Sequence, residues 1–268
     1  MGLLTELKIL IKEYKINPSQ RMGQNFLIES SALEYIKNQI KPDKTKTYIE
    51  IGPGFLFLTK TVSPHAGKII AIEKDKRFTP FYLKNKPENV QVIINDALKV
   101  DFSLFDSTEI FGNIPYNIST ELLLKISREA DINRAVLLLQ KEFAARLLAS
   151  PGNKTYGAIT VFIDFFFEKK FLKTFPPHFF YPRPKISSTL IELKKKTRDH
   201  SIDTDLLFKI VRTAFGKRRK KILNSLSELF GKEKSMEALK SANIPENARP
   251  ESLDTKSFLK LYEFLKKY

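Results

Sequence analysis

The sequence predicts an α/β fold: a doubly wound, Rossmann-like sheet with helices on both faces, followed by a small all-α domain. Two observations predict it. Over the first two thirds of the chain, short runs rich in β-branched and aromatic residues alternate with segments whose apolar residues recur at helical spacing. From residue 203 onward the pattern is purely helical. A charge run at 194–199 separates the two patterns, so we expect domains at 1–196 and 197–268.

The individual elements follow in chain order from the same periodicity. Residues 1–17 predict a leading helix, because Leu3, Leu7 and Leu10 fall on one helical face. A β-rich run at 47–51 ends in Gly-Pro-Gly and gives way to a helical pattern, the usual start of a nucleotide-binding α/β unit. Further strands are expected at 68–73, 90–94, 109–113, 134–140, 157–167, 169–175 and 186–193, and further helices at 30–41, 55–62, 119–129, 141–149, 203–215, 217–230, 233–241 and 252–266.

Length and composition limit the possible classes. The chain has 268 residues, of which 42% are hydrophobic, enough for one large domain and a smaller one. No stretch approaches the roughly 20 apolar residues of a membrane span, and the N-terminus lacks a signal-peptide pattern, so we expect a cytoplasmic protein without membrane contact. The absence of cysteine excludes disulfides, cysteine-ligated metals and thiol catalysis. The few histidines are widely spaced, and we expect no metal site.

The charge points to a polyanionic partner. The formal net charge is +16, more than solubility requires, and the cations are clustered as well as numerous. An unbroken run stands at the start of the helix expected at 217–230: Lys217, Arg218, Arg219, Lys220 and Lys221. Such a run is usually a solvated face, but like charges four residues apart destabilise a helix. We therefore expect the phosphates of a bound nucleic acid to neutralise this run.

The strand at 109–113 ends in the stretch around which we expect the site to form, Phe111-Gly112-Asn113-Ile114-Pro115-Tyr116-Asn117. The exocyclic amine of adenine is a poor nucleophile, so a catalyst must accept hydrogen bonds from both of its N–H groups. The Asn113 side-chain oxygen and the Ile114 carbonyl can do so, and Pro115 restrains the backbone around that carbonyl. Tyr116 offers a flat face for a flipped base. The alternative is an ordinary loop with a buried tyrosine.

Three earlier strands end in residues suited to a nucleotide-like ligand. Gly52 and Gly54 let the backbone approach a ligand closely, and Glu73 stands about 20 residues further on, where such folds place the carboxylate that binds ribose. Asp96, which Ala97 follows, ends the next strand and could accept from an adenine amine. Each acid alone is more often an ordinary strand-end residue. Parallel strands bring their carboxyl ends to one edge, so together these residues predict a ligand site there.

Two further segments stay open on local chemistry alone. Residues 18–27 could be a linker or a lid over a substrate or cofactor. Residues 176–185, in which prolines stiffen a run of aromatics, could form the second wall of a base slot or a loop packed on the sheet edge. We expect one of these aromatics to face the site and the others to pack.

With these residues in hand, the chain resembles the small-subunit ribosomal RNA adenine N6,N6-dimethyltransferases from about Arg21 to Leu265. So many motifs in one order do not arise together by chance. The matching motifs are Gly23-Gln24-Asn25-Phe26-Leu27, Glu50-Ile51-Gly52-Pro53-Gly54, Glu73, Asp96-Ala97-Leu98, Asn113-Ile114-Pro115-Tyr116-Asn117-Ile118-Ser119, Gln140-Lys141-Glu142, Tyr156-Gly157, Phe180-Tyr181-Pro182-Arg183-Pro184-Lys185 and Phe215-Gly216-Lys217-Arg218-Arg219-Lys220.

The resemblance implies a methyltransferase sheet that binds S-adenosylmethionine, with two adjacent adenosines near the 3′ end of small-subunit rRNA as acceptors. It makes segment 18–27 part of the donor pocket, and it matches Tyr116 and Phe180 to the positions that hold the target base. The donor contacts that we expect are Asn25, Leu27, Gly52, Gly54, Glu73, Asp96, Ala97 and Asn113.

One position departs from the family pattern. The glycine loop of the family usually has a further glycine two residues after Gly54, where this chain has Leu56. The added side chain could narrow the pocket and weaken donor binding, or it could point into helix packing.

The resemblance further implies a partly assembled small ribosomal subunit as the partner, and we expect a monomer. Three other functions stay open: a large-subunit rRNA adenine methyltransferase of the antibiotic-resistance type, a non-catalytic rRNA-binding assembly or transcription factor, and a DNA adenine methyltransferase. Tyr156-Gly157 and residues 215–220 favour the small-subunit family over the first, and the intact Asn113–Tyr116 stretch argues against the second.

Overall fold

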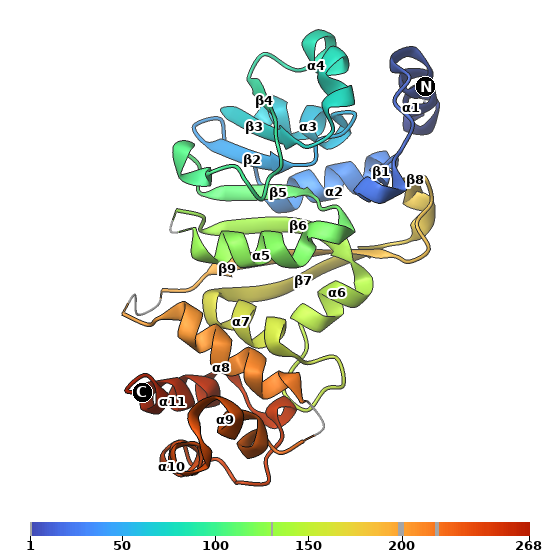
Figure 1. The fold of residues 1–268 in the computed structure, drawn as a ribbon. Coiled ribbons are helices and arrows are strands. Elements are labelled where there is room, and N and C mark those ends of the chain that lie inside the picture. Colours follow the sequence, from blue (N-terminus) through green and yellow to red (C-terminus); the bar gives the residue numbers. More distant parts are fainter. Residues whose placement is uncertain (1, 130, 198–200, 218–219) are drawn as a thin grey trace. The chain divides into compact units, whose positions relative to one another are not determined.

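A computed structural model describes residues 2–129, 131–197, 201–217 and 220–268, and the chain forms two compact units (Figure 1). Unit 1 comprises residues 1–144 and 169–195, and unit 2 comprises residues 145–168 and 196–268. The predicted domains 1–196 and 197–268 stay a prediction, and among the compact units residues 145–168 group with the C-terminal helices. The reason is aromatic packing, since the rings of Phe162 and Phe208 lie 4.2 Å apart. The functional roles of the two parts stay predictions.

Unit 1 is built on a sheet of seven strands in the order β4-β3-β2-β5-β6-β9-β7 (Figure 1). Strands β4, β3, β2, β5 and β6 are parallel, and β9 runs antiparallel to β6. A separate two-stranded sheet pairs β1 with β8. The strands are β1 (Phe26–Leu27), β2 (Thr47–Ile51), β3 (Lys68–Glu73), β4 (Val90–Ile94), β5 (Glu109–Asn113), β6 (Arg134–Gln140), β7 (Phe167–Phe175), β8 (Phe180–Tyr181) and β9 (Ser188–Lys195).

Helices cover the sheet and make up most of unit 2. Helices α1 to α4 bury apolar side chains in one cluster with the inward residues of the sheet, among them Tyr48, Phe111 and Leu138. The described helices are α1 (Leu3–Tyr14), α2 (Ser30–Ile40), α3 (Phe57–Val62), α4 (Thr79–Asn85), α5 (Ser119–Arg128), α6 (Lys141–Leu147), α7 (Ala158–Phe166), α8 (Thr204–Gly216), α9 (Ile222–Phe230), α10 (Lys232–Ser241) and α11 (Thr255–Leu265). Within the described parts of the chain, no helix combines the length and apolar content needed to cross a bilayer.

Most predicted elements are confirmed to within a few residues, but the strand predicted at 157–167 is wrong. Residues 158–166 form helix α7 instead, after Gly157 in an extended conformation. The run is apolar on nearly all sides, so its periodicity does not separate a buried strand from a buried helix. The N–H of Gly157 donates to Thr160 Oγ1 at 3.1 Å, which fixes the start of the helix.

The helix predicted to begin at residue 217 begins only at Ile222. Helix α8 ends at Gly216, and Lys217 has φ −123° and ψ 58°, outside the helical region. Lys220 and Lys221 precede α9, while residues 218 and 219 lie outside the described parts of the chain. Repulsion among adjacent cations opposes a helix here, which is the physical reason for the correction.

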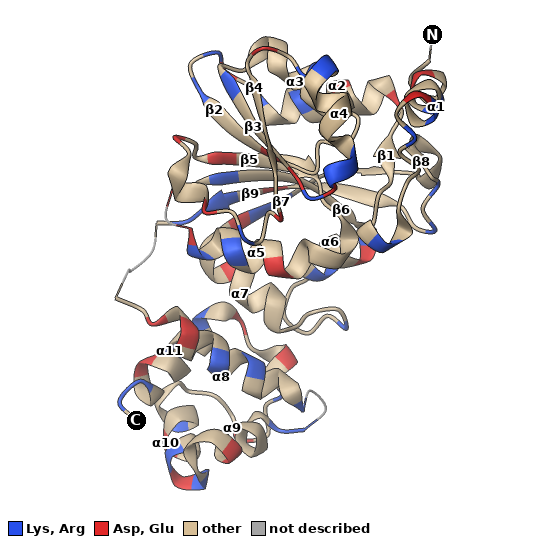
Figure 2. Cartoon of the chain, turned by 45° about the horizontal axis from the view of Figure 1, so that its top comes forward, with Lys and Arg blue, Asp and Glu red and all other residues tan. Residues whose placement is uncertain are grey.

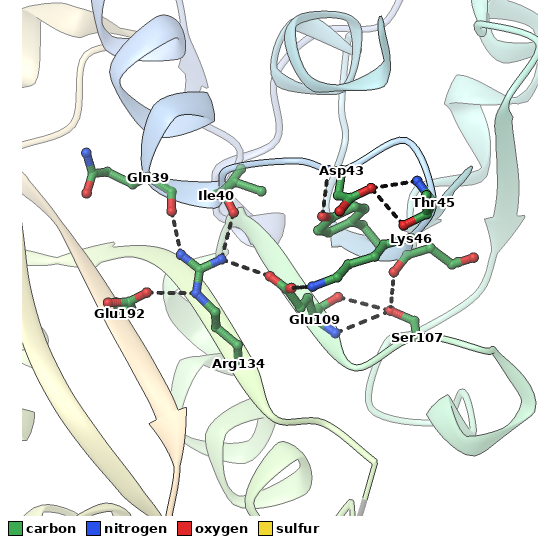
Figure 3. Close-up of polar contacts among 11 residues, drawn as sticks. Gln39, Ile40, Asp43, Thr45, Lys46, Ser107, Glu109, Arg134 and Glu192 are labelled. Carbon is green, nitrogen blue, oxygen red and sulfur yellow. Dashed lines mark hydrogen bonds and ion pairs between the residues drawn. The ribbon is translucent and has the colours of Figure 1, made fainter. Parts of the chain in front are cut away.

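At the edge of the sheet where β5 and β6 begin, Arg134 ties four elements together (Figure 3). Its guanidinium donates to Glu109 at 2.8 Å and to Glu192 at 2.7 Å. It also donates to the carbonyls of Gln39 and Ile40 in the last turn of α2, where a cation complements the helix dipole. The Arg134 side chain is only 18% exposed, so its partners depend on it for charge balance.

We expect Arg134→Met to lower the free energy of unfolding by about 3 kcal/mol, because it removes the cation paired with the largely buried Glu192 and leaves Glu109 with only the exposed Lys46. Lys46→Met is the matched control: it removes another cation from Glu109, but an exposed one, and should cost less than about 1 kcal/mol. Urea unfolding measures both changes. Equal losses in the two variants would contradict the role assigned to Arg134.

Candidate functional site

A cavity of about 470 Å³ opens at the carboxyl edge of the parallel strands, entirely within unit 1. The ends of the strands β2, β3 and β5 and the loop after β4 contribute to its wall. The cavity thus brings together seven residues that the sequence predicted for donor contact: Asn25, Gly52, Gly54, Glu73, Asp96, Ala97 and Asn113.

The glycine loop brings the backbone of β2 close to that of β5. Gly52 has φ +71°, a left-handed conformation that favours glycine, and a Cβ added there would lie 3.7 Å from the Asn113 carbonyl oxygen. Gly54 donates its N–H to Glu73 Oε2 at 3.3 Å. The loop therefore fixes one oxygen of the carboxylate that the sequence assigns to ribose.

Glu73 is buried between three donors. Its Oε1 accepts from the N–H of Asp75 at 2.9 Å, and its Oε2 accepts from Gly54 and, at 3.5 Å, from the Tyr82 hydroxyl. Burial raises the pKa of Glu73 to about 7 despite these bonds. The carboxyl group is thus close to its titration point near neutral pH.

Glu50 lies behind the glycine loop, in a small apolar cavity that Gly52, Asn113 and Leu27 also border. Its side chain is 1% exposed, and among the described residues neither Glu50 Oε2 nor Thr59 Oγ1 has a hydrogen-bond partner. Burial raises the pKa of Glu50 to about 8. At neutral pH this carboxyl group is therefore mainly protonated.

Asp96 is paired with a lysine that the sequence analysis did not single out. Lys74 Nζ lies 2.7 Å from Asp96 Oδ2, and both side chains line the cavity. Asp96 Oδ1 accepts from the N–H of Leu98 at 3.0 Å. Partial burial works against ionisation, but the bond to Lys74 holds the pKa of Asp96 below its ordinary value. Asp96 is therefore an ionised acceptor at the cavity wall.

The amide of Asn113 has a defined orientation. Its Nδ2 donates to the Asn25 carbonyl oxygen at 2.8 Å. This bond fixes which end of the amide is the nitrogen, so that Oδ1 is the end that can accept a hydrogen bond from a ligand. Ile114 is held beside it, because its N–H donates to the Leu138 carbonyl at 3.0 Å. Pro115 has φ −55° and ψ 132° and lines the cavity. The rigid turn predicted from the sequence is present.

Tyr116 is half-buried, and its hydroxyl lies 3.1 Å from the Oγ of Ser188, which is fully buried. Burial raises the pKa of the Tyr116 hydroxyl. The bond to Ser188 fixes the ring beside the turn that contains Asn113. Ser188 has no motif of its own in the sequence, and only the pairing of β9 with β6 brings it here.

Several predicted residues do not line the large cavity. Leu27 borders the small cavity instead. Phe180 is 2% exposed and belongs to the apolar cluster, where its strand pairs with Leu27, so its contact with a target base stays a prediction. The cation run of residues 217–221 belongs to unit 2, and its predicted Arg218 and Arg219 lie outside the described residues.

Leu56 is fully buried in the apolar cluster and does not line the cavity, so its side chain points into packing. It has φ +64°, a conformation that costs a branched residue about 1 kcal/mol relative to glycine. The donor pocket therefore keeps its width at this position.

Two residues of the cavity wall lie next to predicted segments without having been predicted themselves. Lys74 directly follows a predicted strand end, and Ile118 directly follows the predicted stretch 111–117, so this adjacency was the available signal. Six further residues of the wall lie in segment 18–27, which the resemblance assigns to the donor pocket as a whole: Ser19, Arg21, Met22, Gly23, Gln24 and Phe26.

Comparison with known sequences gives a family and named relatives. A sequence model of the family described as "Ribosomal RNA adenine dimethylase" matches residues 16–267. The chain is 36% identical to the ribosomal RNA small subunit methyltransferase A of Alkaliphilus metalliredigens, over 96% of this chain and 95% of that protein. It is 34% identical to the protein of the same name from Clostridioides difficile, over 94% and 92%.

Two solved structures are similar to this chain over most of its length. A dimethyladenosine transferase from Plasmodium falciparum is similar with a TM-score of 0.78 and 28% identity, covering 89% of this chain and 97% of that one. The 23S rRNA methyltransferase ErmE is similar with a TM-score of 0.68 and 22% identity, covering 90% and 100%. The second likeness concerns the fold alone.

The two raised pKa values make stability depend on pH. Between about pH 5 and pH 8 the folded chain keeps protons on Glu50 and Glu73 that the unfolded chain has lost, so the free energy of unfolding falls as pH rises. Glu50→Gln removes the larger contribution. We expect the free energy of unfolding of Glu50→Gln, measured by urea unfolding relative to the wild type, to rise by at least about 1 kcal/mol from pH 5 to pH 8.5. Glu88→Gln, at an exposed position, is the control. If the difference between Glu50→Gln and the wild type does not change with pH, the raised pKa of Glu50 is refuted.

Proposed function

The chain belongs to the ribosomal RNA adenine dimethylase family, and on that premise we propose that it methylates N6 of two adjacent adenosines near the 3′ end of small-subunit rRNA. The products are N6,N6-dimethyladenosines, and the methyl donor is S-adenosylmethionine. The observation that supports this most directly is the meeting of Gly52, Glu73, Asp96 and Asn113 around one cavity.

The residues around the cavity fit the donor. Glu73 offers a carboxylate for ribose hydroxyls, and Asp96 offers an acceptor for the adenine amine beside the small side chain of Ala97. Gly52 and Gly54 line the cavity with backbone alone, and a Cβ added to Gly54 would lie 2.7 Å from the Phe26 ring. When bound, S-adenosylmethionine supplies an electrophilic methyl group on a sulfonium, so the protein mainly orients the reacting groups.

The acceptor side needs two hydrogen-bond acceptors rather than a strong base. Asn113 Oδ1 is left free to accept by the bond from its Nδ2 to Asn25, and the Ile114 carbonyl is the second acceptor that we assign. Accepting both N–H groups of adenine N6 opposes the delocalisation of its lone pair into the ring. The proton leaves to solvent after methyl transfer. In the second methylation only one N–H remains on N6, so it donates to one of the two acceptors.

The target base is flipped out and stacks on Tyr116, with Phe180 as the second contact that the family pattern assigns. The hydroxyl bond of Tyr116 to Ser188 holds the ring without contributing to the chemistry.

RNA is bound through phosphate contacts and shape. Lysine and arginine are distributed over the helices and loops of both units (Figure 2), in keeping with the net charge of +16. We assign part of this contact to Lys217, Lys220 and Lys221 in unit 2, together with their neighbours 218 and 219. The substrate that we propose is a partly assembled small subunit, met in the cytoplasm by a monomer.

Incubating the protein with labelled donor and undermodified small subunits, then mapping the methylated nucleotides, tests the function. We expect two adjacent dimethyladenosines near the 3′ end of the small-subunit rRNA. Label in large-subunit rRNA would support the antibiotic-resistance alternative, and donor binding without transfer would support a non-catalytic assembly factor.

We expect Asn113→Ala to lower kcat by at least about a hundredfold, the size seen when one preorganised polar group is lost from a transition state. Donor affinity, measured by calorimetry, should fall much less. Asn38→Ala, which changes an exposed asparagine of α2, should leave both unchanged. An active Asn113→Ala variant would refute the role of this residue.

We expect Tyr116→Ala to lower kcat/KM by about tenfold or more, because base stacking contributes about 1–3 kcal/mol. Tyr116→Phe and Ser188→Ala keep the ring and should stay within about threefold of the wild type. Steady-state kinetics with the same RNA compares all three. If the phenylalanine variant loses as much as the alanine variant, the hydroxyl rather than the ring is required.

When Lys217, Lys220 and Lys221 are replaced by glutamine, the slope of the logarithm of the RNA-binding constant against the logarithm of the salt concentration should become shallower by about two to three. The measurement is filter binding at several salt concentrations. Lys8→Gln, Lys12→Gln and Lys15→Gln, at two exposed lysines of helix α1 and the exposed lysine directly after it, serve together as a control with the same net charge. An unchanged slope would remove the 217–221 run from the RNA-binding surface.

A further inference from the structure

One wall of the cavity is a segment with almost no apolar anchoring. Ile16 and Phe26 are buried, but none of the residues 17–25 between them is. The segment nevertheless provides a third of the cavity wall. Burial of apolar surface therefore cannot keep it in place, and hydrogen bonds must do so.

Gln24 closes this segment on itself and ties it to the sheet. Its Oε1 accepts from the N–H of Ser19 at 2.8 Å, and its Nε2 donates to Asp75 Oδ2 at 2.9 Å. Asp75 is 2% exposed and lies two residues after Glu73, where β3 ends. The same Asp75 donates its backbone N–H to Glu73 Oε1. One residue thus joins the segment to the carboxylate of the donor site.

Arg77 supports this connection from the other side. Its Nε and Nη2 donate to the Asp75 carboxylate at 2.9 and 2.6 Å, and its Nη1 donates to the Asn17 carbonyl at 3.2 Å. Burial opposes ionisation of Asp75, but the bonds from Arg77 and Gln24 hold its pKa below the ordinary value. Asp75 is therefore a charged acceptor, and hydrogen bonds to charged groups are the stronger ones.

The segment ends at Asn25, whose carbonyl accepts from Asn113 Nδ2. A side-chain amide has two nearly isosteric ends, so nothing in its shape prevents a flipped orientation. The Asn25 carbonyl selects the orientation in which the oxygen is left to accept. Where this carbonyl lies depends on the adjacent Gln24, and hence on Asp75.

We propose that Gln24 and Asp75 are positioning residues for methyl transfer: through the Asn25 carbonyl they orient the Asn113 amide, and they hold the segment 17–25 as a wall of the donor pocket. This inference rests on the proposed function. It deepens that function by naming residues that influence both the contacts to the target base and the pocket for the methyl donor. No group of Gln24 or Asp75 touches a reacting atom in this proposal.

The test variant is Gln24→Glu, which keeps shape and replaces the bond to Asp75 by repulsion between two carboxylates. Gln20→Glu is the matched control, because Gln20 is exposed, lies in the same segment and does not line the cavity. In the double variant Gln24→Glu with Asp75→Asn, an asparagine amide can donate to the new carboxylate, which restores the bond in reverse. Gln24→Ala removes the bond without adding charge and serves if Gln24→Glu does not fold.

The first readout is independent of catalysis: the rate at which trypsin cuts the donor-free protein after Arg21, followed by mass spectrometry. We expect Gln24→Glu to be cut about fivefold faster or more, with Gln20→Glu unchanged. The second readout is donor affinity by calorimetry, expected to fall about tenfold, the effect of losing one hydrogen bond to a charged group. The third is kcat at saturating donor and RNA, expected to fall severalfold. The double variant should recover part of all three.

Faster cutting with unchanged donor affinity and kcat would overturn the proposal, because Gln24 would then be merely structural. Equal behaviour of Gln24→Glu and Gln20→Glu, or no recovery in the double variant, would also overturn it. If the wild type transfers no methyl group at all, the proposed function fails, while cutting and donor affinity still decide whether Gln24 and Asp75 hold the pocket wall.

Discussion

The site depends on the close approach of two neighbouring parallel strands, β2 and β5. A Cβ added to Gly112 would lie 2.4 Å from the Ile51 carbonyl oxygen, so no other residue fits there without moving a strand. The register pairs Glu50 with Phe111, and the two strands consequently end side by side. Because the strands are parallel, the glycine loop after one and the Asn113 turn after the other face the same cavity. The hydrogen bonds of the site then hold the side chains that line this cavity.

Unfavourable features gather at the same edge. Glu50 and Glu73 are buried carboxyl groups with raised pKa values, and Leu56 has a left-handed backbone conformation. Each costs stability, and the apolar cluster and the Arg134 network at the opposite edge offset that cost. Such unfavourable features are expected at a binding edge, because residues there are selected for binding rather than for stability, and stabilising contacts elsewhere offset their cost.

Local sequence pattern was sufficient for the central sheet. The strands that end at Ile51, Glu73, Ile94 and Asn113 have strong β-rich runs with clear ends. The donor residues predicted at or just after these ends line the cavity, whereas Ile114 and Tyr116 do not. Residues whose position depends on distant pairing could not be found that way. Phe180 is buried because its strand pairs with β1, and Ser188 reaches Tyr116 because β9 lies beside β6. Helix α7 was missed because an all-apolar run has no usable period.

The division into units separates two demands on the protein. Every residue assigned to the donor or to the target base lies in unit 1, whereas the described cations of the 217–221 run lie in unit 2. Hydrogen bonds in unit 1 have to fix groups to within fractions of an ångström, since methyl transfer requires alignment. Phosphate contacts tolerate far looser geometry, because charge attraction falls slowly with distance. The described cations Lys217, Lys220 and Lys221 can therefore lie outside a helix without harming function, whereas the turn at Asn113 needs a strand on each side.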